Sequence, residues 1–209
     1  MIIQTCEQYT AEWWDGRRGL PTASCADKIV TPTGKLSAQS RGYINELIAA
    51  KLGFADEAIE PTEWMARGIE LEPEARAFYE FTTDETVEQV GFITDDDITA
   101  GCSPDGLIYG GPGQRVMDIS KGWEVKCPKA STHVGYLLGG TLPDYYKPQV
   151  HFSMAVTGLS EWVFMSYFPG MDPLIITVKS DAYTDNVAAA IQGFVAQLRE
   201  AQKRLGIEA

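Results

Sequence analysis

The chain has 209 residues, of which 44% are hydrophobic and 22% are charged. This length can bury the core of one domain and is short for two, so we expect a single domain over residues 1–209. The 17 basic residues against 29 acidic residues give a formal net charge of −12. Such an acidic balance argues against a general nucleic-acid coat protein, because those proteins carry a net basic surface.

No membrane or export signal is visible. The sequence has no run of about 18 apolar residues, and its first ten residues lack the basic and apolar regions of a signal peptide. We therefore expect no membrane association and a cytoplasmic location. The cysteines have no CxxC spacing and are expected to be free thiols; they are Cys6, Cys25, Cys102 and Cys127.

The N-terminal third is predicted to be helical. Hydroxyl side chains at Thr22 and Ser24 favour a helix N-cap before residues 26–30. Apolar residues at helical spacing predict a second helix from about residue 37, ended by Gly53. A third helix is expected from residues 61–62, and Pro73 should kink or break it.

The middle third changes to short segments separated by turn residues, which is typical of strands. The expected strands cover residues 86–93, 98–102, 106–109, 116–119 and 123–127. They predict a small, mostly antiparallel sheet.

The remaining chain alternates helices with strands. Helices are expected over 131–138 and 145–156, with strands over 162–168 and 174–179. The C-terminus is predicted to be a long amphipathic helix. Its apolar stripe is Val187, Ile191, Phe194, Val195, Leu198 and Leu205. The fold class is therefore α/β or α+β, with a central mixed β-sheet flanked by helices.

The residues with the clearest chemical pattern are Asp105, Glu124 and Lys126. In a strand, Glu124 and Lys126 share one side while Val125 faces the core. If a neighbouring strand end brings Asp105 alongside, two carboxylates and the Val125 carbonyl offer oxygen ligands to Mg²⁺ or Mn²⁺. A metal and a lysine at one site suit phosphodiester hydrolysis. The alternative is a solvated ion pair on a strand surface.

The sequence around these residues resembles that of a known family. Segments 100–107 (AGCSPDGL) and 123–128 (WEVKCP) are similar to the lambda exonuclease-like branch, the YqaJ-type viral recombinases, of the PD-(D/E)xK nuclease superfamily. Segments 17–24 (RRGLPTAS), 68–76 (GIELEPEAR) and 148–154 (PQVHFSM) match further landmarks in the same order. The resemblance implies a restriction-endonuclease-like core.

The resemblance also implies roles for the catalytic residues. Asp105 and Glu124 would bind metal ions together with the Val125 carbonyl, and Lys126 would orient or deprotonate the attacking water. Gln149 would brace the site. Two further carboxylates have structural alternatives. Glu72 would reach the metals unless it is a helix-surface residue, and Asp95 would contribute an acid, although the adjacent Asp96 and Asp97 leave the register open.

A second set of residues would hold the DNA end. By resemblance, Arg17 would bind the 5′-terminal phosphate, with Ser24 and Ser103 as hydroxyl donors. A guanidinium group matches a phosphate, and a helix N-terminus near Ser24 would add backbone donors and a favourable dipole. The alternative is an exposed basic pair, Arg17 and Arg18.

The function implied is a Mg²⁺-dependent 5′-to-3′ exonuclease that degrades one strand of linear double-stranded DNA. It would release 5′-mononucleotides and leave a 3′ overhang for phage-type recombination in a bacterial host. Family members act as homotrimeric rings and pass the overhang to a single-strand annealing protein. The alternatives are another PD-(D/E)xK endonuclease and a non-catalytic module that binds DNA ends.

Overall fold

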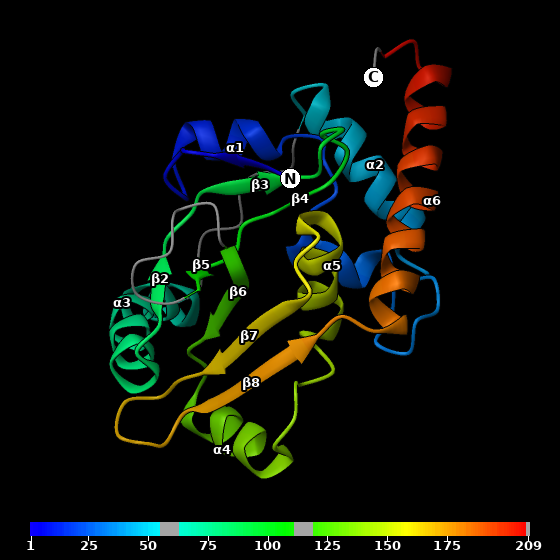
Figure 1. The fold of residues 1–209 in the computed structure, drawn as a ribbon. Coiled ribbons are helices and arrows are strands. Elements are labelled where there is room, and N and C mark those ends of the chain that lie inside the picture. The colour runs from blue at the N-terminus through cyan, green and yellow to red at the C-terminus, as the bar shows by residue number, and fades with distance from the viewer. Residues whose placement is uncertain (55–62, 111–118, 208–209) are drawn as a thin grey trace.

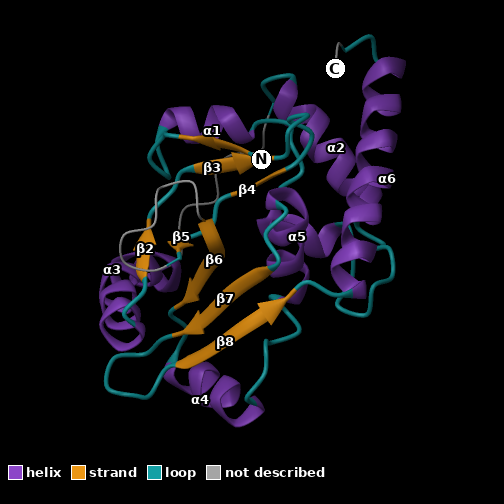
Figure 2. Cartoon of the chain, viewed as in Figure 1, coloured by secondary structure: helices purple, strands orange, loops and turns teal. Residues whose placement is uncertain are grey.

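The computed structural model describes residues 1–54, 63–110 and 119–207, and its strands form two sheets (Figures 1 and 2). A three-stranded sheet has the order β1-β3-β4, and a five-stranded mixed sheet has the order β2-β5-β6-β7-β8. The strands are β1 (Ile2–Gln4), β2 (Thr86–Glu88), β3 (Phe92–Thr94), β4 (Gly101–Cys102), β5 (Gly106–Tyr109), β6 (Ile119–Lys126), β7 (Glu161–Ser166) and β8 (Leu174–Lys179). Only β6 and β7 are parallel among the described pairs.

Helices lie on both sides of the five-stranded sheet, with α3 on one side and α5 on the other, and α6 packs against α5 and α2 (Figure 1). Their bounds are α1 (Ala11–Arg17), the 3₁₀ helix η1 (Ala23–Lys28), α2 (Ser40–Lys51), α3 (Glu63–Thr83), α4 (Ala130–Gly139), α5 (Lys147–Thr157) and α6 (Ala182–Arg204). The expected mixed sheet flanked by helices is therefore present. No helix in the described ranges is both long and apolar enough to span a membrane.

Strand alternation divides the core between the two sides of the sheet. Trp123 and Val125 of β6 pack in one cluster with Ala75 and Tyr79 of α3. Glu124, between them in sequence, must face the opposite side, where α5 lies. The amphipathic C-terminal helix is also confirmed, with its predicted stripe buried as far as Leu198. Leu205 is 64% exposed and lies just beyond the helix.

The structure divides one predicted strand and lengthens another. The strand expected over 86–93 is divided into β2 and β3, which belong to different sheets. Gly91 lies between the two strands, where the chain passes directly against another backbone segment: a Cβ at Gly91 would lie 1.8 Å from the Cys6 carbonyl oxygen. The strand expected over 123–127 begins earlier, as β6, while residues 116–118 lie outside the described residues.

Pro73 does not break its helix. Helix α3 continues from Glu63 to Thr83 with Pro73 in its interior. Proline removes one helical hydrogen bond, but Pro73 is exposed, where water can satisfy the carbonyl group that loses its donor. The helix expected over 26–30 is also shifted, since the 3₁₀ helix η1 begins at Ala23. The four cysteines are free thiols, as expected.

Candidate active site

The antiparallel pairing of β5 with β6 brings Asp105 beside Glu124 and Lys126. Gly106 pairs with Trp123, so Asp105, which precedes β5, lies beside the end of β6. The Val125 N–H donates a hydrogen bond of 2.7 Å to Asp105 Oδ2. Two acidic residues separated by 19 positions are thus brought to adjacent strands, as the sequence pattern requires.

Glu124 is the centre of a buried polar cluster. Its side chain is only 3% exposed, and its Oε1 accepts hydrogen bonds of 2.5 Å from both Lys126 Nζ and Gln149 Nε2. Strand alternation places Glu124 and Lys126 on one side, and α5 supplies Gln149 from the facing layer. Val125 points into the core, 2% exposed.

The structure distinguishes among the three closely spaced glutamates of α3. The Tyr167 hydroxyl donates a 2.6 Å hydrogen bond to Glu74, and Glu70 is exposed. Glu72 lines a cavity of about 410 Å³ together with Val125 and Lys126. Of the three, Glu72 is therefore the one directed toward the predicted site.

Burial and repulsion between neighbouring carboxyl groups raise the carboxyl pKa values in this cluster. Burial, together with the Asp105 carboxylate, raises the pKa of Glu72 to about 8. Burial also raises the pKa of Glu124 to about 7 against the opposing effect of Lys126, and burial raises the pKa of Asp105. Burial acts to lower the pKa of Lys126, but Glu124 and Asp105 outweigh it and the net shift is upward. Repelling carboxyl groups of this kind are stabilised by an added cation.

The donor chemistry fits a divalent metal ion. Asp105, Glu124 and the Val125 carbonyl present oxygen atoms, which Mg²⁺ and Mn²⁺ prefer. Within the described ranges, however, no group of three or more His, Cys, Asp or Glu side chains forms a ready metal-ligand cluster. The oxygen donors therefore comprise two carboxylates and a backbone carbonyl, with Glu72 across the cavity.

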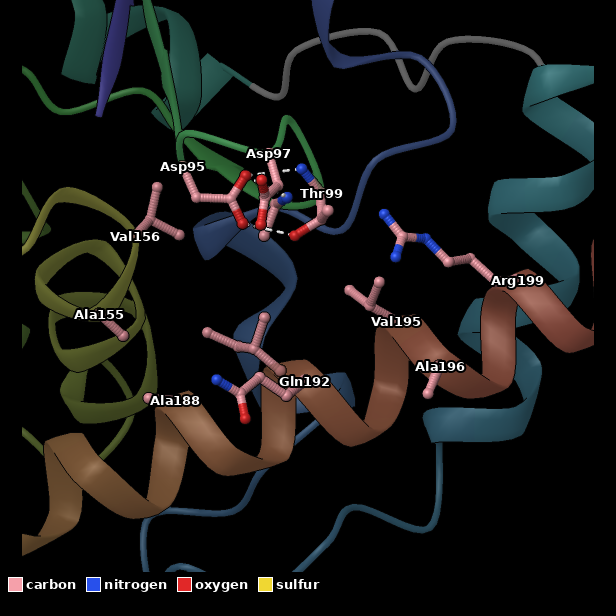
Figure 3. Close-up of a pocket in the computed structure, with 12 residues that line it drawn as sticks. Asp95, Asp97, Thr99, Ala155, Val156, Ala188, Gln192, Val195, Ala196 and Arg199 are labelled. Atoms are coloured by element: carbon pink, nitrogen blue, oxygen red, sulfur yellow. Dashed lines mark hydrogen bonds between the residues drawn. The ribbon is translucent and has the colours of Figure 1, made fainter. Parts of the chain in front are cut away.

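Asp95 does not join this cluster, which corrects its predicted place among the metal ligands. Its carboxylate accepts hydrogen bonds from the backbone N–H groups of Thr99 and Ala100 and from the Thr99 hydroxyl. These bonds close the turn between β3 and β4, at the opposite end of β4 from Asp105. Asp95 lines a separate cleft of about 300 Å³ beside α5 and α6 (Figure 3). The turn between β3 and β4 therefore separates Asp95 from Asp105.

The three residues expected to bind a 5′-phosphate lie together. Arg17 donates hydrogen bonds of 2.8 Å to Ser103 Oγ and 3.1 Å to Ser24 Oγ. Its guanidinium carbon lies 4.2 Å from the centroid of the Trp13 ring, and burial lowers the pKa of Arg17. Arg18 is instead exposed and pairs with Asp15 at 2.5 Å. Arg17, rather than Arg18, is therefore the arginine that the fold brings together with Ser24 and Ser103.

Ser24 lies near a helix N-terminus, as expected, because the six-residue 3₁₀ helix η1 begins at Ala23. Thr22 occupies the N-cap position, but its hydroxyl makes no capping hydrogen bond. So short a segment carries little dipole.

Sequence reasoning missed the aromatic lining of the cavity beside Glu72 and Lys126. Its walls include Tyr9, Trp14, Trp64 and Tyr146. Lys126 Nζ lies 5.6 Å from the centroid of the Tyr146 ring. A signal was present for Trp14, because two successive tryptophans on one helix cannot both face the core. The other rings come from segments that only the tertiary fold brings together.

A family profile described as the YqaJ-like viral recombinase domain matches residues 12–160. The chain belongs to this YqaJ-like family. The matched range contains both residue groups described above, from Arg17 to Gln149. A search of curated proteins finds no significant match.

Solved structures agree with the family assignment. An alkaline exonuclease from Laribacter hongkongensis, LHK-Exo, is 31% identical, with a TM-score of 0.79 over 94% of this chain and 96% of that one. LHK-Exo in complex with dAMP is similar at 30% identity and a TM-score of 0.72, over 94% of this chain and 98% of that one. A phage-related exonuclease from Haemophilus somnus 129PT shares the fold, at 14% identity and a TM-score of 0.60, over 88% and 96% of the two chains.

Proposed function

We propose that this YqaJ-like protein is a Mg²⁺-dependent 5′-to-3′ exonuclease that degrades one strand of linear double-stranded DNA. The observation that carries the proposal is the meeting of Asp105, Glu124 and Lys126 at paired strand ends. The likeness to solved exonucleases at about 30% identity supports the same reaction class.

In the proposed reaction, Asp105, Glu124 and the Val125 carbonyl hold the metal ion. Bound Mg²⁺ would supply Lewis acidity and neutralise charge on the phosphate under attack. Lys126 is kept as an ammonium ion by the carboxylates next to it, so it orients the attacking water and stabilises developing negative charge. Gln149 fixes the Glu124 carboxylate by donating to Oε1, and Glu72 supplies a further carboxylate across the cavity.

Arg17, Ser24 and Ser103 bind the 5′-terminal phosphate in this proposal. A guanidinium group and two hydroxyls suit the oxygen atoms of a phosphate monoester, and anchoring that phosphate near the metal site makes cleavage depend on a DNA end. The products are 5′-mononucleotides and a 3′ overhang, which a single-strand annealing protein would receive. A homotrimeric ring would enclose the duplex.

The proposal is tested with a linear duplex labelled at one end, assayed with Mg²⁺ and with EDTA. We expect 5′-mononucleotides from 5′-phosphorylated ends, slower release from 5′-hydroxyl ends, and no product with EDTA. Mononucleotides released from the 3′ end would contradict the polarity. Light scattering is expected to give a mass three times the 23.0 kDa of one chain.

The same assay separates the alternatives. A PD-(D/E)xK endonuclease would cut closed circular DNA as readily as linear DNA, and a non-catalytic end-binding module would retain the linear duplex without product. Either result would replace the exonuclease proposal.

A further inference from the structure

Trp14 is an exposed tryptophan on a short helix. Its side chain is 53% exposed, whereas its neighbour Trp13 is buried at 5%. The two rings make a T-shaped contact with centroids 4.6 Å apart. An edge-type contact leaves an indole face available for parallel stacking.

Trp14 lies between the two groups of functional residues. One cavity, of about 380 Å³, is lined by Trp14 with Arg17 and Thr22. The catalytic cavity, of about 410 Å³, is lined by Trp14 with Glu72 and Lys126. Among the described lining residues of these two cavities, Trp14 is the one that they share.

This position determines what would meet the indole ring. If Arg17 holds the terminal phosphate and Asp105 with Glu124 hold the next phosphate, the sugar and base between them would lie near Trp14, which borders both cavities. Here the argument rests on the proposed function. Arg17 lies over Trp13 rather than Trp14, so its guanidinium group does not compete for the ring.

We propose that Trp14 forms a nucleobase-binding subsite, in which the indole face stacks on the base of the 5′-terminal nucleotide. All four bases have a π-face, so stacking orients the terminal nucleotide without selecting a sequence. That property suits an enzyme that advances along DNA one nucleotide at a time. Trp14 is a substrate-positioning residue here, distinct from the groups that hold metal or phosphate.

The test compares Trp14→Ala with wild-type protein on two 5′-phosphorylated duplexes. One is normal, and the other carries a tetrahydrofuran abasic residue as its first 5′ nucleotide. On the normal duplex, Trp14→Ala is expected to lower kcat/KM by about 5- to 150-fold, the range that base stacking supplies. On the abasic duplex, wild type and variant should be equal, because no base is present to stack. Trp14→Phe should restore most of the activity on the normal duplex.

Matched controls separate stacking from a structural effect. Phe81 of α3 is 91% exposed and lines neither cavity, so Phe81→Ala should leave both rates unchanged. Equal losses on the normal and abasic duplexes for Trp14→Ala, or no loss on either, would overturn the subsite. Melting temperatures of all variants check that the fold is retained.

A binding experiment keeps the subsite testable if the proposed function fails. A wild-type protein that degrades neither duplex contradicts the exonuclease proposal. The affinities of wild type and Trp14→Ala for a fluorescent 5′-phosphorylated dinucleotide, with and without its first base, then test whether Trp14 stacks on the base. Stacking requires that Trp14→Ala weaken binding of the normal dinucleotide alone, and equal affinities for wild type and variant would refute it.

Discussion

At the residue scale, Lys126 differs from other surface lysines because buried carboxylates surround it. Its ammonium group contacts Glu124 at 2.5 Å. Lys126→Ala is expected to lower the rate of mononucleotide release by about 10²- to 10⁴-fold, the usual contribution of a positioned proton donor or acceptor. The rate is measured on a 5′-phosphorylated linear duplex.

Lys121 provides a matched control on the same strand. It also forms an ion pair, with Glu85 at 2.7 Å, but does not line the catalytic cavity. Lys121→Ala should therefore retain full activity. Similar rates for Lys126→Ala and Lys121→Ala would show that the catalytic site is misplaced.

Arg17 is expected to determine the preference for a 5′-phosphate. Lysine cannot reproduce its two hydrogen bonds, so Arg17→Lys should lower kcat/KM on 5′-phosphorylated ends by about 10- to 150-fold. Rates on 5′-hydroxyl ends should be unchanged. Arg18→Lys, at the exposed neighbour, should alter neither substrate, and a loss on both types of end for Arg17→Lys would argue for a structural role.

His151 makes the stability depend on pH. Burial lowers its pKa below the ordinary 6.5, with Lys147 adding to the shift and Asp181 opposing it. The imidazole of His151 therefore binds a proton more tightly in the unfolded chain than in the folded protein. The contribution of neutral His151 to the free energy of unfolding is complete above pH 6.5 and is lost as the pH falls through the lowered pKa. The melting-temperature difference between wild type and His151→Asn should be largest at high pH and shrink under acid conditions. Parallel curves would contradict this assignment.

At the element scale, the parallel pairing of β6 with β7 depends on Gly122. A Cβ there would lie 2.3 Å from ring atoms of the fully buried Trp162. Gly122→Ala is therefore expected to destabilise the fold by about 1–3 kcal/mol and to lower the melting temperature by about 2–12 °C.

Gly135 serves as the control for this substitution. It lies within helix α4, and a Cβ there would meet no atom within 4 Å. Gly135→Ala should raise stability slightly, because alanine favours the helix by about 0.5–1 kcal/mol. Calorimetry measures both variants, and an unchanged melting temperature for Gly122→Ala would show that the two strands can separate to admit a methyl group.

At the scale of the whole molecule, the net charge of −12 opposes general binding to DNA. Part of that charge lies in Glu72, Asp105 and Glu124, which a bound metal ion would offset. In the proposed ring, the remaining acidic surface would face outward and only the channel would need to be basic.

Binding should accordingly require a DNA end. The Lys126→Ala variant is expected to bind a 5′-phosphorylated linear duplex about tenfold or more tightly than closed circular DNA, since charge-assisted contacts of Arg17 are made only at an end. Filter binding at physiological salt measures the ratio. Equal affinities would contradict end recognition and the proposed acidic exterior.

Local sequence patterns determined which side chains of this protein face the core within single strands and helices. Strand alternation predicted that Glu124 and Lys126 share one side while Val125 is buried, and helical spacing predicted the buried stripe of α6. These features depend on backbone geometry that repeats over a few residues. The sequence left the approach of Asp105 to β6 as a condition, which the pairing of β5 with β6 meets.

Only the tertiary structure decided which chemically similar neighbours face the site. Glu72 and Glu74 are two residues apart on α3, yet Glu74 accepts a hydrogen bond from Tyr167 whereas Glu72 lines the cavity beside Lys126. Asp95 is implied as a site residue by the family resemblance, but its carboxylate closes the turn between β3 and β4. Trp14 borders two cavities whose walls come from distant segments. Such outcomes depend on long-range packing, which no local period encodes, because a side chain's partners come from whichever element the fold places beside it.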